Sequence, residues 1–170
     1  MKKNFKEHLD DIRAFVFDVD GVFTNCQVMI TLEGDFLRTF NMKDGLAVVR
    51  AVEKKYPIAI ISAGGGEQVE KRMKMLGVTH IYLKQHDKLE TLKKFSEEVG
   101  IPLSQMSYMG DDYPDLKALK SVRLGVAPSD AIDDIKSVAA YTSAFKGGEG
   151  CVRDIIEQVL RARGDWFSVE

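Results

Sequence analysis

The chain has few cysteines, and their positions argue against two classes of protein. Only two occur among its 170 residues, Cys26 and Cys151. They are far apart in the sequence and neither belongs to a CxxC pair, so neither a disulfide framework nor a cysteine-based zinc site is indicated. This use of cysteine is typical of a reducing compartment, and we expect the protein to be cytoplasmic.

Long apolar runs and an excess of charge of one sign are also missing. No stretch is apolar over the roughly 20 residues that a membrane-spanning helix needs. Lys and Arg number 24 against 26 Asp and Glu, which gives a net charge of -2. The protein is therefore expected to be soluble, without a membrane or a nucleic acid as partner. An anionic ligand would have to be held by a local site.

What the chain does contain is a regular alternation of apolar runs and helix-periodic segments. A hydrophobic content of 45% over 170 residues suits one core, so we expect a single domain over residues 1–170. The alternation predicts an α/β fold with a doubly wound, mostly parallel sheet. The predicted strands are 15–17, 57–61, 80–83, 106–109, 122–126 and 140–142, and the predicted helices are 1–12, 44–55, 68–76, 88–99, 114–120, 130–137 and 151–163.

Residues 27–41, between the first strand and the first long helix, carry a different signal. Two short runs flank the sequence LEGD, in which Gly34 can adopt a positive φ. This pattern predicts a β-hairpin. In the helix that follows, Leu46, Val49 and Val52 share one face, which we expect to be the buried one.

Two carboxylates follow the first apolar run where it stops abruptly. The sequence FDVDG places Asp18 and Asp20 directly after a predicted buried strand, with Gly21 in the turn. Ligands bind at the carboxyl ends of strands in open α/β sheets, and alternation along an extended backbone puts both carboxylates on one side. One carboxylate could then attack a substrate while the other moves protons.

Further polar groups stand at the ends of later strands. Ser62 follows the second strand, Lys88 comes shortly after the third, and GDDYPD, residues 110–115, follows the fourth. Together with FDVDGVFT, this series resembles the four motifs of the haloacid dehalogenase superfamily of phosphatases. The resemblance implies phosphoryl transfer through an aspartyl-phosphate intermediate.

Phosphoryl transfer to a carboxylate needs a nucleophile, a proton donor and positive charge on the transferring oxygens. By the resemblance, Asp18 would attack phosphorus, and Asp20 would protonate the leaving group and then deprotonate water. Ser62 and Lys88 would bind the phosphate oxygens.

A carboxylate and a phosphate repel one another, so a hard cation is required. Asp18 and Asp111 offer the oxygen ligands that Mg²⁺ prefers, and we expect Mg²⁺ as the cofactor. The family resemblance adds the backbone carbonyl of Asp20 as a third ligand. Asp112 and Asp115 would hold metal-bound water.

A receiver-type signalling domain is a second hypothesis, because it also combines an acidic Mg²⁺ site with Ser or Thr and Lys on a doubly wound sheet. A receiver carries its acidic pair on the first strand and its phosphorylated Asp on the third. It has no second carboxylate placed to hydrolyse the phosphate, a position that Asp20 fills here. Catalytic release of phosphate from an ester distinguishes the two.

The segments between the motifs leave no room for the lid domain that many members of the superfamily insert. The sequences GVFTNCQVMI, RTFNMKDGLAVV, MLGVTHIYLKQHDK, YMGDDYPDL and GGEGCVRDIIEQVL resemble the lidless branch, the 3-deoxy-D-manno-octulosonate 8-phosphate phosphatases, over about residues 12–160. The resemblance implies a sugar-acid phosphate as substrate, a role in lipopolysaccharide synthesis, and a homotetramer whose hairpins meet at the centre.

The resemblance also implies which residues face the substrate. Carried over position by position, these are Thr24, Asn41, Lys43, Asp44, Gly64 and Arg153. Lys43 and Arg153 would bind a second anionic group of the substrate, although both could be ordinary surface charges, and Asp44 could simply cap the helix that it opens.

Two departures bear on the identity of the sugar acid. Ser62, Ala63 and Gly64 stand where the branch often has Thr-Gly-Arg, and Glu149 stands where a basic residue is common. A basic side chain near the phosphate or sugar is therefore missing. The phosphate of a nine-carbon sugar acid is the alternative substrate.

Overall fold

A computed structural model describes residues 4–168 of the chain. Six strands form one sheet in the order β5-β4-β1-β6-β7-β8, and all neighbouring strands are parallel. The strands are β1 (Ala14–Phe17), β4 (Ile58–Ile61), β5 (His80–Tyr82), β6 (Met106–Met109), β7 (Leu124–Ala127) and β8 (Tyr141–Thr142). The predicted doubly wound, parallel sheet is confirmed, and β1 lies at its centre between β4 and β6.

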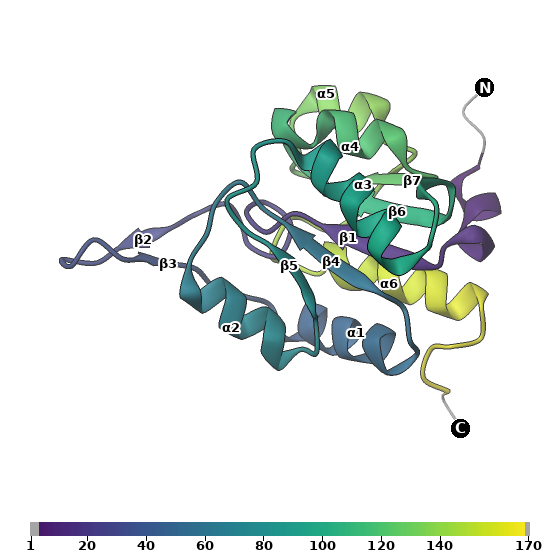
Figure 1. The fold of residues 1–170 in the computed structure, drawn as a ribbon, viewed down its shortest axis with the longest axis horizontal. Helices are drawn as coiled ribbons and strands as arrows, with labels where there is room; N and C mark the ends of the chain where they lie inside the picture. The colour runs from purple at the N-terminus through teal and green to yellow at the C-terminus, as the bar shows by residue number, and fades with distance from the viewer. Residues whose placement is uncertain (1–3, 169–170) are drawn as a thin grey trace.

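Helices cover both faces of the sheet (Figure 1). On one face lie α1 (Met42–Glu53), α2 (Glu67–Met75) and α6 (Cys151–Ala162), and on the other α3 (Lys88–Val99), α4 (Leu116–Ser121) and α5 (Asp133–Val138). Short 3₁₀ helices span Phe5–Asp11, Leu103–Gln105 and Tyr113–Asp115. The first of these lies in the predicted helix 1–12, of which residues 1–3 are outside the described part. Within residues 4–168, none of the helices combines the length and apolar character needed to cross a membrane.

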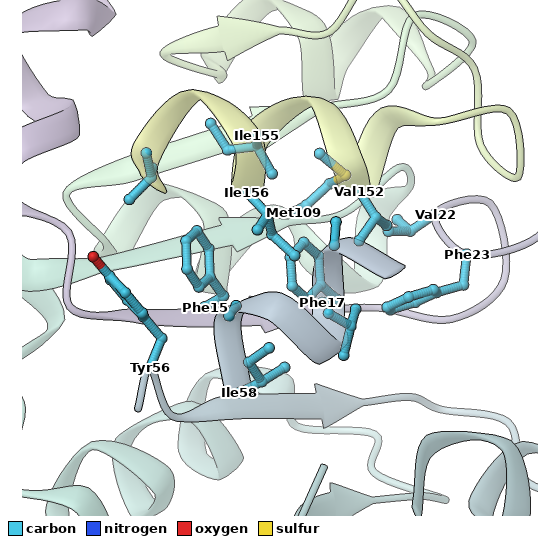
Figure 2. Packing of buried hydrophobic residues seen from close by; sticks show 14 of the residues in the cluster. Phe15, Phe17, Val22, Phe23, Tyr56, Ile58, Met109, Val152, Ile155 and Ile156 are labelled. Atoms are coloured by element: carbon cyan, nitrogen blue, oxygen red, sulfur yellow. The ribbon is translucent and has the colours of Figure 1, made fainter. Parts of the chain in front are cut away.

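The side chains of β1 alternate between the two cores. Phe15 and Phe17 point toward α6, where they pack near Ile155 and Ile156 (Figure 2). Ala14 and Val16 belong to the other core, beneath α3 and α4. Because successive residues of a strand face opposite sides, the next residue in the Ala14 series, Asp18, falls on the side of α3 and α4.

The buried face of α1 agrees only in part with the expected one. Val49 and Val52 are partly buried against the core, as expected, but Leu46 is not. The buried residues of α1 are small or polar, namely Asp44, Gly45, Ala47, Val48 and Ala51, whereas the side chain of Leu46 is 48% exposed. This helix packs against α6. Small side chains let two helices approach closely, so the face with small residues is buried although the other face carries larger apolar side chains.

The predicted hairpin is confirmed between residues 27 and 41. Strands β2 (Met29–Ile30) and β3 (Phe36–Leu37) pair antiparallel, and the hairpin projects away from the sheet (Figure 1). Its apolar side chains are largely exposed, namely Val28, Met29, Ile30, Leu32, Phe36 and Leu37.

Candidate active site

The carboxyl ends of β1 and β6 flank the site. The chain leaves β1 toward β4 and leaves β6 toward β7, so the two connections diverge at this point, which is where open α/β sheets bind ligands. A cavity of about 170 Å³ opens here. Every residue predicted for the chemistry and the metal lines it, together with Gly64: Asp18, Asp20, Ser62, Lys88, Asp111, Asp112 and Asp115.

A tight turn after β1 positions the two aspartates. The backbone N–H groups of Val22, Phe23 and Thr24 donate to the carbonyl oxygen of Val19 at 3.2, 2.9 and 3.3 Å. The Thr24 side chain is fully buried, and its Oγ1 accepts weakly from the N–H of Cys26 at 3.3 Å. Thr24 was predicted to bind substrate, but the structure places it within this turn and outside the cavity walls.

Two glycines allow the close approaches around this turn. Gly21 has φ of +85°, and a Cβ there would lie 1.9 Å from Oδ2 of Asp111. Gly147 packs from the other side, where a Cβ would lie 2.1 Å from the carbonyl oxygen of Gly21. The glycine-rich loop before α6 therefore braces the aspartate turn, and no larger residue fits either position.

Lys88 lies buried between two carboxylates. Lys88 is the first residue of α3, and its Nζ is 2.9 Å from Oδ2 of Asp18 and 2.7 Å from Oδ1 of Asp115. Asp115 accepts further hydrogen bonds from the hydroxyl of Tyr108 at 2.7 Å and the N–H of Asp111 at 3.0 Å. Both oxygens of Asp115 are thus occupied by donors from the protein, and this residue holds Lys88 and the turn after β6 in place.

The charges at the site are unbalanced toward the negative. Burial, together with the nearby Asp115, raises the pKa of Asp18 to about 7 against the opposing effect of Lys88. Burial and the charge of Asp18 raise the pKa of Asp111 to about 8. Burial alone would lower the pKa of Lys88, but Asp18 and Asp115 outweigh it and raise that pKa. A single lysine does not offset the carboxylates gathered here.

These residues fit a divalent cation. Oxygen atoms of Asp18, Asp111 and Asp115 lie within 4.8 Å of one another. Each oxygen of Asp115 accepts two hydrogen bonds from the protein, whereas each oxygen of Asp18 accepts one and keeps a lone pair. Asp18 and Asp111 are therefore the two carboxylates available as direct ligands. A divalent cation between them would favour their ionised forms and lower both raised pKa values. Oxygen-only donors of this kind match the preference of Mg²⁺.

Sequence reasoning missed Arg38. This residue follows β3 at the base of the hairpin, and its Nε lies 2.7 Å from Oδ1 of Asp20 while its Nη2 lies 3.1 Å from Oδ2. Its side chain is only 9% exposed. An arginine after a hairpin strand carries no local signal. Two indirect signals exist: Arg38 begins RTFNMKDGLAVV, one of the stretches that resemble the family, and the glycine run from Gly64 lacks the basic side chain common there.

Asn41 and Asp44 fasten the glycine-rich loop. The Asn41 side chain caps α1 by accepting from the N–H of Lys43 at 2.8 Å, and its Nδ2 donates to the carbonyl oxygen of Gly148 at 3.2 Å. Asp44 accepts from the N–H of Arg153 at 2.8 Å. The idea that Asp44 caps its own helix is therefore wrong, because its carboxylate lies at the amino end of α6 instead, where the helix dipole favours negative charge.

Lys43 and Arg153 are not brought to the catalytic cavity. They line a separate cavity of about 480 Å³ beside α6, whose other walls include Phe145, Glu149, Asp154, Glu157 and Arg161. Arg153 is also paired with Glu157, with 2.9 Å between Nε and Oε2. Of the residues predicted to bind substrate, Gly64 alone lies in the walls of the catalytic cavity within the described chain.

Asp44 gives a prediction about pH. It is fully buried, its Oδ2 has no hydrogen-bond partner, and burial raises its pKa from 3.8 to about 6. Between these values the folded state keeps a proton that the unfolded state has released. The free energy of unfolding therefore falls as the pH rises through this window, by at most about 3 kcal/mol.

The Asp44→Asn variant lacks this titration. Urea unfolding at pH 4, 5, 6 and 7 should show the stability of the variant gaining on the wild type as the pH rises. Asp35→Asn, in the exposed hairpin turn, is the control and should follow the wild type. Parallel pH profiles for the wild type and Asp44→Asn would contradict the prediction.

The fold and the site define an α/β enzyme with a carboxylate-lined, cation-binding centre. The model of the haloacid dehalogenase-like hydrolase family matches residues 53–155. The 3-deoxy-D-manno-octulosonate 8-phosphate phosphatase of Escherichia coli K12 is 33% identical over 155 residues, which are 91% of this chain and 82% of that protein. This chain belongs to the haloacid dehalogenase-like hydrolases, which sets aside the receiver-domain hypothesis.

Solved structures of the same type resemble the chain closely. The 3-deoxy-D-manno-octulosonate 8-phosphate phosphatase of Moraxella catarrhalis, in complex with magnesium, phosphate and KDO, is 32% identical with a TM-score of 0.91, covering 95% of this chain and 93% of that one. The enzyme of that name from Yersinia pestis is 30% identical with a TM-score of 0.93, covering 96% and 88%. As in the predicted lidless branch, the chain described here has only the hairpin and α1 between β1 and β4.

Proposed function

We propose that this protein is a Mg²⁺-dependent phosphatase that hydrolyses 3-deoxy-D-manno-octulosonate 8-phosphate to the sugar acid and phosphate, for lipopolysaccharide synthesis. We place the activity in one domain over residues 1–170, acting in the cytoplasm. The observation that carries the proposal is the meeting of Asp18, Asp20, Ser62, Lys88 and Asp111 in one cavity. The relatives named above carry this activity in their names.

In the first step an oxygen of Asp18 attacks phosphorus. The bond between Asp18 and phosphorus forms as the ester bond from phosphorus to the sugar oxygen breaks, and Asp20 gives a proton to that oxygen. The N–H of Val19 donates to Oδ1 of Asp18 at 2.7 Å and Lys88 lies against Oδ2, so the nucleophile is held in one orientation. Ser62 and Lys88 bind the phosphate oxygens.

In the second step water hydrolyses the aspartyl phosphate. Asp20, now ionised, takes a proton from the water as its oxygen attacks phosphorus, and the bond between phosphorus and Asp18 breaks. Phosphate leaves, and Asp18 returns as a free carboxylate. Asp20 thus acts as the proton donor in the first step and as the base in the second.

Mg²⁺ would be held by the carboxylates of Asp18 and Asp111 and by the backbone carbonyl of Asp20, with Asp112 and Asp115 around it. When bound, it neutralises the negative charge that the attacking carboxylate and the phosphate bring together. Chelation should therefore abolish activity, and added Mg²⁺ should restore it.

Asp111→Asn should raise the Mg²⁺ concentration needed for half-maximal activity, whereas the control Asp35→Asn should not. Isothermal titration of Mg²⁺ into each protein measures the same difference without turnover. Full activity in excess chelator would remove the metal from this account.

The substrate proposal is tested by kcat/KM. We expect the eight-carbon sugar-acid phosphate to be preferred over both its nine-carbon analogue and glucose 6-phosphate. A preference of more than about tenfold for the nine-carbon compound, or about 1.4 kcal/mol of transition-state binding, would make that compound the substrate. Equal values for glucose 6-phosphate would contradict a sugar-acid substrate altogether.

Lys43 and Arg153 are the cations proposed for the carboxylate of the sugar acid. Because they line a cavity separate from the catalytic one, they would act on a substrate held between two subunits, at the end opposite the phosphate. Lys43→Gln should raise KM for the sugar-acid phosphate and leave KM for glucose 6-phosphate unchanged, whereas a rise in both would contradict the assignment.

We also propose that the hairpin assembles a homotetramer. The exposed apolar side chains of the hairpin form a patch that the chain itself does not cover, and such patches mark contacts between proteins. Ile30→Lys combined with Phe36→Lys should yield monomers in light scattering, while the control Val138→Lys, on α5, should leave the assembly intact. A fully active wild-type monomer would contradict the proposal.

A further inference from the structure

Arg38 and Asp20 form a forked pair at the rim of the catalytic cavity. Two guanidinium nitrogens face the two carboxylate oxygens, and the pairing with Asp20 raises the pKa of Arg38. A planar guanidinium that meets a carboxylate in this way fixes the plane and the direction of the carboxylate, which a single lysine nitrogen cannot do. The side chain of Arg38 thus connects the base of the hairpin to Asp20 in the catalytic cavity.

The two oxygens of Asp20 have different surroundings. Oδ1 accepts from Nε of Arg38 at 2.7 Å and, more weakly, from the Thr24 hydroxyl at 3.4 Å. Oδ2 accepts from Nη2 of Arg38 at 3.1 Å and faces Gly64, where an added Cβ would lie 3.4 Å away. Oδ1 is therefore the anchored oxygen, and Oδ2 is the weakly held one beside open space.

Gly64 is what leaves that space open. A Cβ at residue 64 would lie 3.6 Å from Nη2 of Arg38 and 3.6 Å from Oγ of Ser62. A long side chain at this position would have to extend among Arg38, Ser62 and Oδ2 of Asp20. Arg38 therefore lies beside the space that a basic side chain at residue 64 would have to enter.

We propose that Arg38 is a positioning residue for Asp20. It anchors Oδ1, so that Oδ2 points over Gly64 to the place where the leaving group departs. The proton then passes from Oδ2 to the leaving oxygen as the ester bond breaks, and in the second step Oδ2 takes a proton from the attacking water. This inference rests on the proposed phosphatase function.

Two substrates with different leaving groups separate this role from a structural one. A sugar phosphate releases an alkoxide, which needs a proton, whereas 4-nitrophenyl phosphate releases a phenolate that needs none. In single turnovers with excess enzyme at saturation, Arg38→Met should slow release of the sugar by about 10²-fold, the range of a lost proton transfer. Release of 4-nitrophenolate should change by less than about threefold, because Asp20 gives no proton in that step.

Two further variants complete the experiment. Arg123→Met is the matched control, because Arg123 also pairs with a carboxylate through Nε and Nη2, which both donate to Oδ2 of Asp11 at 2.9 and 2.7 Å on the surface. This variant should change neither rate. Arg38→Lys keeps the positive charge but not the two-nitrogen contact, so it should also slow release of the sugar selectively, by a smaller factor. This variant replaces Arg38→Met in the test if Arg38→Met fails to fold.

Equal losses on both substrates, or no loss on either, would overturn the inference while leaving the phosphatase function in place. A wild-type enzyme that releases neither product would overturn the proposed function and this inference with it.

Discussion

Replacing Asp18 by asparagine should abolish phosphate release, with kcat reduced by at least about 10⁴-fold. The amide has almost the same shape as the carboxylate but is neither charged nor an effective nucleophile. The fold should survive, because Lys88 keeps its partner Asp115 and because burial already disfavours a charge at residue 18. Thermal unfolding should therefore show a midpoint at or above that of the wild type.

Asp112→Asn is the matched control for this variant. Asp112 lines the same cavity but is exposed, and its side chain accepts from the N–H of Tyr113 at 2.7 Å. We expect its activity to remain within about tenfold of the wild type, since it acts only through water. More than a trace of activity in Asp18→Asn would contradict the nucleophilic role.

The Lys88→Met variant should lose both stability and activity. Lys88 is 3% exposed, and its removal leaves the buried carboxylates of Asp18 and Asp115 without a cation. Breaking a buried pair in this way costs about 3–5 kcal/mol, which chemical denaturation of the metal-free protein would measure. We also expect kcat to fall by at least about 10²-fold, because the charge on the phosphate oxygens is no longer offset.

Lys93→Met tests whether this loss reflects burial. Lys93 lies on the same helix, α3, but is exposed, with its Nζ 2.6 Å from Oε1 of Glu90. Exposed pairs of this kind contribute little, so stability and activity should stay close to the wild type. Similar losses of stability and activity in the two variants would contradict the importance of the buried position of Lys88.

Short-range patterns in the sequence, together with the family resemblance, were enough to predict the sheet and the acidic residues, the serine and the lysine of the catalytic cavity. Buried strands ending in polar residues place those residues at one edge of a parallel sheet, wherever they lie in the chain. Helix α3 begins at Lys88 and ends at Val99 as predicted, because Asp87 caps its start and Gly100 its end. This is why Asp18, Ser62 and Asp111 were found without any knowledge of their contacts.

Features that depend on pairing between distant segments could not be predicted in this way. Asn41 forms a hydrogen bond with Gly148, and Asp44 forms one with Arg153. The two partners are more than 100 positions apart in each case. The exposure of Leu46 was missed for the same reason, because the partner helix α6 packs against the small side chains of α1. Arg38 is separated from Asp20 by only 18 positions, but a hairpin lies between them and no periodic pattern marks the pair.

The most direct test of the account is to trap the phosphorylated enzyme. In Asp20→Asn, 4-nitrophenyl phosphate should still phosphorylate the chain, because its leaving group needs no proton, but hydrolysis should be slow without a base. Acid quenching, proteolysis and mass spectrometry should then find one phosphoryl group, on Asp18, and none in the variant that also carries Asp18→Asn. A chain that stays unmodified while nitrophenolate is released, or a phosphoryl group on any other residue, would contradict the proposed mechanism.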